Sequence, residues 1–565
     1  MNSVILDQNV VKSIGENGHL QNDWSTDIKK KFVELYFQMV RYNDHTDIEK
    51  QWRIIIESFK GNEKTIEFKS VIKMVANTRD IIDGKGEQQL SFMLLYVLFD
   101  YYPELSKFIF VKFITMEDEH CLGSLKDIKY FCYYIKNKSD GKHPLIDYIL
   151  SISYDLLKKD ECSLNKGGLI SLFGKWFPRS KSKKFGWINR RFAEMYYYKI
   201  MKTSVGKGKK LARRKCLTKL RQLLSRLNKH LDTTQIKMTS KKWSKIDFNK
   251  VTGPTLRVHK KSFQNIDKLG RVRSIDKDRI HCSTNLKKYL RKAIEGSVVV
   301  KGQRVDMYKL VKDAYNALTE EDINIVNEQW KDNSNMNKEM NKFFIPMIDV
   351  SDGMKNEENI PMYNSIGFGI RVAEKTHPSF RNRILTFGEI PTWIQFTEDM
   401  TFHQKVVAMK KTGFKGGRTN FYKALQMILD VYVENNILPI EVEKMVPILF
   451  SDFQINTALE STYNLTTMME NIKLMYNEAG LQTCWKTPYK VSHILLWNLR
   501  KTGGFPSSVY EPNTSMFSGY NPVLLNKFAE KGMPNIVQTP FTMLIRILNN
   551  NRYKFIDGCI HKYFK

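Results

Sequence analysis

The 565-residue sequence has few cysteines and no long apolar run. Its seven cysteines are scattered, and no two of them form a Cys-x-x-Cys pair, which argues against a disulfide framework and a structural zinc site. The first residues, MNSVILDQNV, carry Asp7 inside their apolar run and do not resemble a signal peptide. The longest apolar run, Phe92 to Phe99, is too short to cross a membrane. We therefore expect a cytoplasmic protein in a reducing compartment, neither secreted nor membrane-bound.

Acidic residues are scarce relative to basic ones, and the imbalance is local. The chain has 90 Lys and Arg against 59 Asp and Glu, a net charge of +31. Residues 175–230 contain 19 basic residues and one acidic residue, and residues 231–301 contain 18 basic and 6 acidic residues. These two segments carry +18 and +12, nearly all of the net charge. A segregated block predicts a binding surface for a polyanion, with nucleic acid favoured over an anionic membrane. The alternative is a basic surface with no specific partner.

The densest basic stretches are PRSKSKKFGWINRR and GKGKKLARRK. Phe185 and Trp187 lie among the cations of the first, a pattern typical of phosphate contact combined with base stacking. Trp187 and Phe192 could equally anchor a basic helix in the core, and such runs also occur in nuclear targeting signals. The expected nucleic-acid contacts are Lys181, Lys183, Lys184, Trp187, Arg190, Arg191, Lys207, Lys209, Lys210, Arg213, Arg214 and Lys215.

The first part of the chain has the apolar spacing of successive amphipathic helices. Leu145, Ile149, Ile152 and Leu156 form one such stripe, and Gly and Pro residues separate the helical segments. This pattern predicts a body of helical repeats, although no strict repeat period is visible. The next hundred residues are basic, have few apolar runs and are expected to bridge two domains.

From Phe343 onward, short apolar runs alternate with helical stretches, as in an open, mostly parallel sheet covered by helices. The runs are FFIPMID, RILTF, PTWIQF, MVPILFSD, VSHILLWN and TSMFSGY. The fold class expected is therefore multidomain, an α-helical repeat body followed by a doubly wound α/β domain. The expected organisation is an N-terminal extension (1–22), a helical-repeat domain (23–245), a basic bridging segment (246–340), an α/β domain (341–535) and a C-terminal helical segment (536–565).

Polar residues follow the strands at the edge where such folds bind ligands. Asp349 and Ser351 follow the first expected strand, Thr419 precedes a strong helix, and Asp452 ends the strand MVPILFSD. Two carboxylates with hydroxyl groups form an all-oxygen ligand set, which suits Mg²⁺. Each aspartate alone could instead cap a helix. Two-metal phosphoryl chemistry needs more carboxylates, so neither a nuclease nor a phosphotransferase is expected.

This constellation resembles the metal-ion-dependent adhesion site (MIDAS) of von Willebrand factor A (vWA) domains. Asp349, Ser351, Thr419 and Asp452 match the motif's first Asp, first Ser, Thr and final Asp, whereas Gly353 stands where the motif has its second Ser. The resemblance implies a Rossmann-like vWA domain with a weak Mg²⁺ site that a water would have to complete at Gly353. Such a site could bind a protein partner.

The remaining motifs resemble an uncharacterised family known only as a domain of unknown function. Its helical half is similar to the TROVE module of telomerase-associated, Ro and vault proteins, and members occur in eukaryotes and large DNA viruses. The matching stretches are NTRDIIDGKGE, GSLKDI, LFGKWFPR, KCLTKLRQLLSRLNKHL, KKWSKIDF, LLWNLR and FSGYNPVLL. The Asn-, Lys- and Ile-rich composition is typical of an AT-rich genome, which makes a giant virus a plausible source.

The resemblance implies a ring of helical repeats that binds RNA and that the vWA-like domain closes. We therefore expect a non-catalytic RNA-binding scaffold of a ribonucleoprotein. A metal-dependent protein-interaction module and a non-specific nucleic-acid packaging protein of a virion stay open as alternatives. A viral factory or a virion is the matching location within the reducing compartment.

Overall fold

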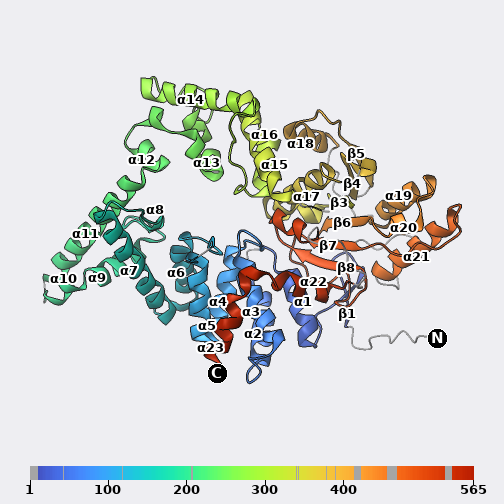
Figure 1. Ribbon diagram of the computed structural model, residues 1–565, viewed down its shortest axis with the longest axis horizontal. Coiled ribbons are helices and arrows are strands. Elements are labelled where there is room, and N and C mark those ends of the chain that lie inside the picture. The colour runs from blue at the N-terminus through green and yellow to red at the C-terminus, as the bar shows by residue number, and fades with distance from the viewer. Residues whose placement is uncertain are drawn as a thin grey trace.

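A computed structural model gives the structure of the chain. It describes residues 11–41, 44–117, 119–204, 206, 208–338, 340, 343–376, 378–387, 390–412, 421–454, 468–528 and 538–564. The chain forms a helical body, a group of bridging helices and an α/β domain. In Figure 1 the ribbon runs from the helical body through the bridging helices to the sheet, which lies back against the first helices.

The helical body consists of α1 (Ile28–Gln38), α2 (Thr46–Ser58), α3 (Ile66–Arg79), α4 (Gln88–Tyr101), α5 (Pro103–Ile114), α6 (Lys126–Ser139), α7 (Pro144–Asn165), α8 (Phe173–Trp176), α9 (Gly186–Tyr196), α10 (Tyr198–Lys202), α11 (Gly208–Leu231) and α12 (Thr234–Thr239). The helices form because apolar residues recur every three or four positions. In α11 the buried side chains are Ala212, Cys216, Leu220, Leu223 and Leu227, a single stripe that packs against α8 and α9.

The bridging group consists of α13 (Gly253–Phe263), α14 (Lys277–Ile294), α15 (Met307–Tyr315) and α16 (Glu320–Ser334), with 3-10 turns η1 (Trp243–Lys245) and η2 (Phe248–Lys250) before it and η3 (Asn335–Asn337) after it. The first part has a small core of its own around Phe263 and Leu286. Further along, α15 packs on α17 of the α/β domain. The segment therefore contains regular helices despite its high charge.

The α/β domain contains a six-stranded sheet with the order β5-β4-β3-β6-β7-β8. Its strands are β3 (Phe344–Asp349), β4 (Arg383–Phe387), β5 (Thr392–Gln395), β6 (Val446–Ser451), β7 (Ile494–Asn498) and β8 (Thr514–Ser518), and only the edge strand β5 pairs antiparallel. All six apolar runs of the sequence lie at these strands. The strand order reverses between β3 and β6, which places a ligand crevice at their carboxyl ends.

Helices cover both faces of the sheet, so β3, β6, β7 and β8 are buried at every position. Alternate residues of β3 enter different cores: Phe344 and Ile348 face one side, Ile345 and Met347 the other. The first side is covered by α17 (Asn356–Ala373), α18 (Phe402–Lys411), α15 and α16, and the second by α19 (Phe421–Glu434), α20 (Pro439–Val442) and α21 (Met468–Gln482). Short 3-10 turns connect these elements at η4 (Asp352–Lys355), η5 (Pro378–Phe380) and η6 (Pro522–Phe528).

Both ends of the described chain pack across the boundary between the two halves. A hairpin of β1 (Lys12–Ile14) and β2 (Leu20–Asn22) lies against the α/β domain, where Asn22 pairs with Phe505. At the other end, α22 (Pro540–Leu548), η7 (Asn551–Tyr553) and α23 (Phe555–Tyr563) pack on α3 and α5. Residues 11–22 are thus part of the folded structure and not a detached extension.

Among the described helices, none combines the length and the apolar character that crossing a membrane requires.

Candidate functional site

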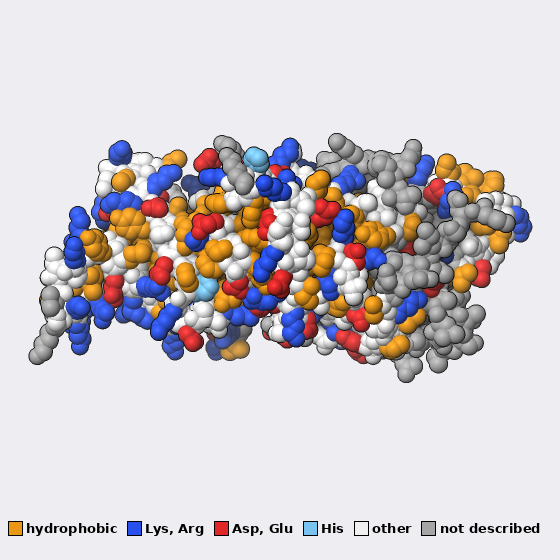
Figure 2. Space-filling view, turned by 90° about the horizontal axis from the view of Figure 1, so that it is seen from below, with side chains coloured by type: hydrophobic (Ala, Val, Ile, Leu, Met, Phe, Trp, Pro, Cys, Tyr) orange, Lys and Arg blue, Asp and Glu red, His pale blue; other side chains and the backbone are white. Residues whose placement is uncertain are grey.

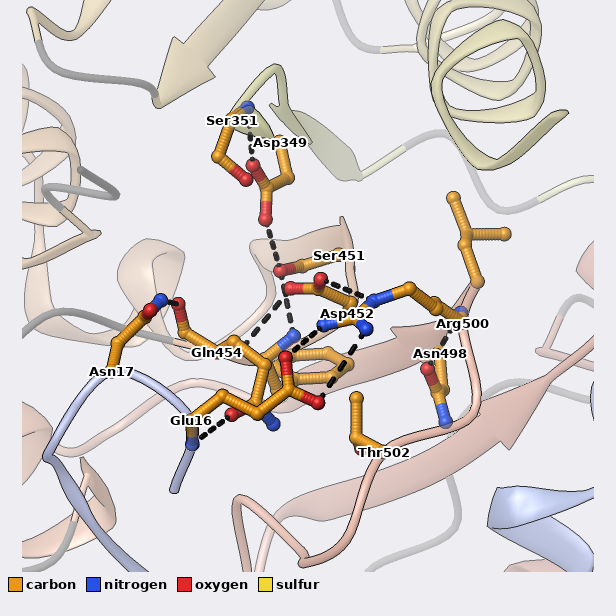
Figure 3. A network of polar contacts seen from close by, with 12 residues as sticks. Glu16, Asn17, Asp349, Ser351, Ser451, Asp452, Gln454, Asn498, Arg500 and Thr502 are labelled. Carbon is orange, nitrogen blue, oxygen red and sulfur yellow. Dashed lines mark hydrogen bonds and ion pairs between the residues drawn. The ribbon is translucent and has the colours of Figure 1, made fainter. Parts of the chain in front are cut away.

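The two aspartates of the expected metal site lie side by side at the switch point of the sheet. Asp349 is the last residue of β3 and Asp452 follows β6, and these strands are neighbours in the parallel sheet. Both side chains are fully buried. Figure 3 shows them with Ser351 and Ser451 at the carboxyl edge. The structure thus brings Asp349, Ser351 and Asp452 to one edge of the sheet, and their role as metal ligands stays a prediction.

Hydrogen bonds already occupy most of the carboxylate oxygens. Asp349 Oδ1 accepts from the backbone N–H of Ser351 at 2.8 Å, and its Oδ2 accepts from Ser451 Oγ at 2.6 Å. Asp452 Oδ1 accepts from the backbone N–H of Gln454 at 3.1 Å. These bonds fix the orientation of both carboxylates.

Arg500 neutralises Asp452 from the next strand. Its Nε donates to Asp452 Oδ2 at 2.8 Å, and its Nη2 donates to Glu16 Oε2 at 2.7 Å. Asn498, at the end of β7, accepts from the backbone N–H of Arg500 and so positions the loop that carries it. The guanidinium therefore supplies a positive charge next to the aspartate that the metal-site motif requires (Figure 3).

The sequence reasoning missed both Arg500 and Glu16. A signal for Arg500 was present, because it follows the strand run VSHILLWN and so had to lie at the same sheet edge as the aspartates. Glu16 had no such signal. It comes from the β1–β2 hairpin, whose position depends on tertiary packing.

Burial raises the pKa of the Asp349 carboxyl, and the nearby negative charge of Asp452 raises it further. Hydrogen bonds from Ser451 and Ser351 act in the opposite direction. Asp452 has Arg500 as a counter-ion, whereas Asp349 has only neutral donors among the residues that the structure describes. A cation at this edge would therefore stabilise the ionised form of Asp349.

There is little space at Gly353. A Cβ atom there would lie 2.5 Å from Asp452 Oδ2 and 3.7 Å from Arg500 Nη2. The Asp452 carboxylate therefore lies close beside Gly353, and glycine leaves room for it. The water expected to complete the metal site at this position stays a prediction.

Thr419 lies outside the described residues, so its part in the metal site stays a prediction. The described residues contain no group of three or more His, Cys, Asp or Glu side chains that could hold a metal ion. Asp349, Ser351 and Asp452 do fit a weak oxygen site, but a cation would have to compete with Arg500 for Asp452.

The basic surface is centred on the exposed side of α11. Lys209, Lys210, Arg213, Arg214 and Lys215 are all exposed there. One acidic partner is present, Glu194, which lies 3.2 Å from Arg213. Lys and Arg side chains line the left-hand edge of the face in Figure 2, the end of the molecule where α9 to α11 lie in Figure 1. These cations share one face because the buried stripe of α11 occupies the other.

The remaining expected contacts divide into two groups. Lys181, Lys183, Lys184 and Arg190 are exposed beside α9, whereas Arg191 is half-buried and pairs with Asp147 at 2.5 Å. Lys207 lies outside the described residues.

The two aromatic residues of this stretch pack against the core. Trp187 and Phe185 are half-buried there, and Phe192 is fully buried. The packing of Trp187 against the core favours its interpretation as an anchor of helix α9. It argues against an exposed ring on which a base would stack.

The motif RDIIDGKGE joins the two halves of the protein. Lys85 is fully buried and donates to the backbone carbonyls of Tyr36 and Met39 and to Ser518 of β8. Asn521 donates to the carbonyl of Gly84 at 2.6 Å. Two motifs far apart in sequence, RDIIDGKGE and FSGYNPVLL, therefore contact each other directly.

Arg79 and Asp80 of this motif do not pair with each other. Arg79 lies 2.8 Å from Asp127 on α6, and Asp80 lies 2.8 Å from Arg552 near the C-terminus. Tyr553 also donates to Asp80 at 3.1 Å. These contacts give the motif a structural role.

Comparison with known proteins matches the α/β domain to one family. Residues 343–539, which run from β3 to the start of α22, match the family described as Domain of unknown function (DUF7788). The chain is also similar to the "Uncharacterized protein L728" of Acanthamoeba polyphaga mimivirus, with 24% identity over 499 residues that cover 84% of this chain and 78% of that protein. The similarity to a giant-virus protein agrees with the composition.

Proposed function

We propose that the protein is a non-catalytic RNA-binding scaffold, with a TROVE-like helical body that binds RNA and a vWA-like domain that closes the ring. The observation that carries this proposal is the exposed cationic face of α11, where Lys209, Lys210, Arg214 and Lys215 have no acidic partner among the described residues. A cluster of this kind attracts phosphates by charge alone and releases their counter-ions.

The path of the chain supports the closing role of the α/β domain. The domain packs on the bridging helices through α15 and on the helical body through Lys85 and Ser518. The strand order with an antiparallel edge strand β5 is compatible with a vWA-like fold. Because the α/β domain contacts both the bridging helices and the helical body, it holds the helical body at a fixed curvature. A scaffold needs this fixed shape, which a flexible linker between the two halves would not provide.

No catalytic role is proposed. Two carboxylates lie at the sheet edge, and Arg500 and backbone donors engage them. The three His, Cys, Asp or Glu ligands that a catalytic metal usually has are not found together in the described part of the chain.

A second candidate function is a metal-dependent contact with a protein partner. Asp349, Ser351 and Asp452 meet at the switch point, and Mg²⁺ would add positive charge beside Asp349, which has no counter-ion. Arg500 competes for the same carboxylate, so we propose that any Mg²⁺ binds weakly.

The test compares single-stranded RNA with duplex DNA of equal length in direct competition for the purified protein. We expect RNA to bind at least tenfold more tightly, because unpaired bases can stack while duplex bases cannot. Equal or tighter binding of the duplex would favour a nucleic-acid packaging protein of a virion. Absence of binding to both would refute the proposal.

A further inference from the structure

Trp176, at the end of α8, is surrounded by three lysines. The Nζ atoms of Lys126, Lys175 and Lys129 lie 4.2 Å, 5.0 Å and 5.5 Å from the centroid of its ring. All four side chains are half-buried. Lys126 and Lys129 are one turn apart on α6, so the two helices bring the cations together over one indole.

These lysines have no acidic partner in the described structure. Neighbouring Asp127 is fully buried and engaged by Arg79, by Gln88 Nε2 at 2.6 Å and by the backbone N–H of Ser124. Burial and the charge of Lys126 both lower the pKa of Lys129 and of Lys175. Lys126 therefore repels both Lys129 and Lys175, and an anion placed between these lysines would relieve that repulsion.

Aromatic rings and cations alternate beyond Trp176. Lys129 also lies 5.6 Å from the centroid of Phe185, whose ring contacts Tyr130 and Tyr133. Lys184 lies 4.1 Å from the Tyr133 centroid. Because Lys129 is close to both rings, Trp176 and Phe185 belong to one continuous surface.

The surface lies on the side of the helical body that faces the bridging helices. In Figure 1, α6 and α8 lie in the part of the helical body across from α13 and α15. The charges of Lys309 and Asp306, at the start of α15, act on Lys126. A chain bound here would therefore run along the inner side of the curved body, whereas α11 offers charge at its far end.

We propose that this surface binds consecutive nucleotides of single-stranded RNA, a site that deepens the RNA-binding function and rests on it. The residues are Lys126, Lys129, Lys175, Trp176, Lys184, Phe185 and Tyr133, which we call the aromatic track. The lysines bind backbone phosphates, and a base stacks on the ring of Trp176, while the half-buried Phe185 borders the same surface. Alternating rings and cations fit an unpaired strand, because a duplex hides its base faces.

The test separates the contribution of base stacking to RNA affinity from the contribution of phosphate binding. Binding of a labelled 12-nucleotide RNA is compared with that of an abasic ribose-phosphate oligomer of equal length, at fixed salt. Wild-type protein should bind the RNA at least tenfold more tightly than the abasic oligomer. Trp176→Leu should lower the ratio of RNA affinity to abasic affinity about fivefold or more and leave abasic binding unchanged, while Trp176→Phe should keep most of that ratio.

The matched control is Trp485→Leu, which changes an indole on the α/β domain that is 45% exposed. This variant should keep the wild-type ratio.

An unchanged ratio in Trp176→Leu, with RNA still bound, would overturn the aromatic track and leave the scaffold function standing. Failure of wild type to bind either oligomer would refute the scaffold function itself. A second measurement needs no variant: RNA carrying 5-iodouridine is cross-linked to wild-type protein and the attachment sites are mapped. Cross-links at Trp176, Phe185 or Tyr133 support the track, and cross-links confined to other residues overturn it.

Discussion

Buried ion pairs join helices within the helical body and hold the C-terminal segment to it. Arg79 and Asp127 are almost fully buried, and so is Asp80, which pairs with Arg552. Removing one partner of such a pair leaves an uncompensated charge in the interior, which costs more than the pair itself contributes. The residues of RDIIDGKGE are therefore expected to matter for stability and not for RNA contact.

Replacing Arg79 by Met should destabilise the protein strongly. Asp127 would keep only neutral donors, and the expected loss is about 3 to 5 kcal/mol in the free energy of unfolding. The matched control is Arg53→Met, whose ion pairs with Glu49 and Asp100 are at the surface and are expected to contribute under about 1 kcal/mol. Chemical denaturation measures both, and equal losses would contradict a special role for the buried pair.

His493 should make stability depend on pH. Burial lowers its pKa from 6.5 to about 4, and its Nε2 lies 2.9 Å from Ser515 Oγ. The unfolded chain binds a proton below pH 6.5 that the folded chain does not, so stability falls from pH 6.5 toward pH 4, by up to about 3 kcal/mol. His493→Asn should flatten this part of the profile, measured as the thermal midpoint at each pH. If the exposed control His561→Gln flattened it equally, the effect would not belong to His493.

At the scale of elements, the sequence predicted strands better than their surroundings. The runs at β3, β6, β7 and β8 could be recognised because a parallel strand buried on both faces is largely apolar. The aspartates could be placed together for the same reason, since the ends of β3 and β6 meet at one edge. Helices α13 and α14 were harder to predict, because charged residues cover all but a narrow apolar stripe.

The contacts that shape the candidate site could not be read from local patterns. Gly353 matched a motif position by spacing, yet its role is to make room for the Asp452 carboxylate. Trp187 lay among cations in sequence, yet helix α9 turns it toward the core. The cluster around Trp176 had no local signal in the sequence, because Lys126 and Lys129 come from another helix about fifty residues earlier.

Arg500 should control cation binding at this sheet edge. In wild type its guanidinium holds Asp452, so Mg²⁺ binding should be weaker than millimolar. Arg500→Met leaves Asp452 without a counter-ion, so Mg²⁺ should bind more tightly and raise the thermal midpoint more than in wild type. Calorimetric titration measures the affinity. If wild type bound Mg²⁺ as tightly as Arg500→Met or more tightly, Arg500 would not compete with the cation for Asp452.

At the scale of the whole molecule, the positive charge and the contacts between the two halves lie in different parts of the chain. The net charge of +31 is concentrated in the middle third of the sequence, which the fold carries to one end and to the bridging helices. The near-neutral remainder forms helices α1 to α7, the α/β domain and the C-terminal helices. Under the proposed function, this division would keep the RNA-binding surface separate from the sheet edge proposed for a protein partner.

The measurement that tests the RNA-binding claim most directly is the salt dependence of affinity, in wild type and in a variant with Lys209, Lys210, Arg213, Arg214 and Lys215 changed to Glu. Acidic residues in the first turns of α11 suit the helix dipole, so the variant should fold. If roughly 6 to 10 phosphates are contacted, wild-type affinity for single-stranded RNA should fall about 10³- to 10⁵-fold between about 50 and 200 mM salt. The variant should bind every RNA sequence more weakly and with a shallower salt slope. Unchanged affinity and slope in the variant would contradict the account.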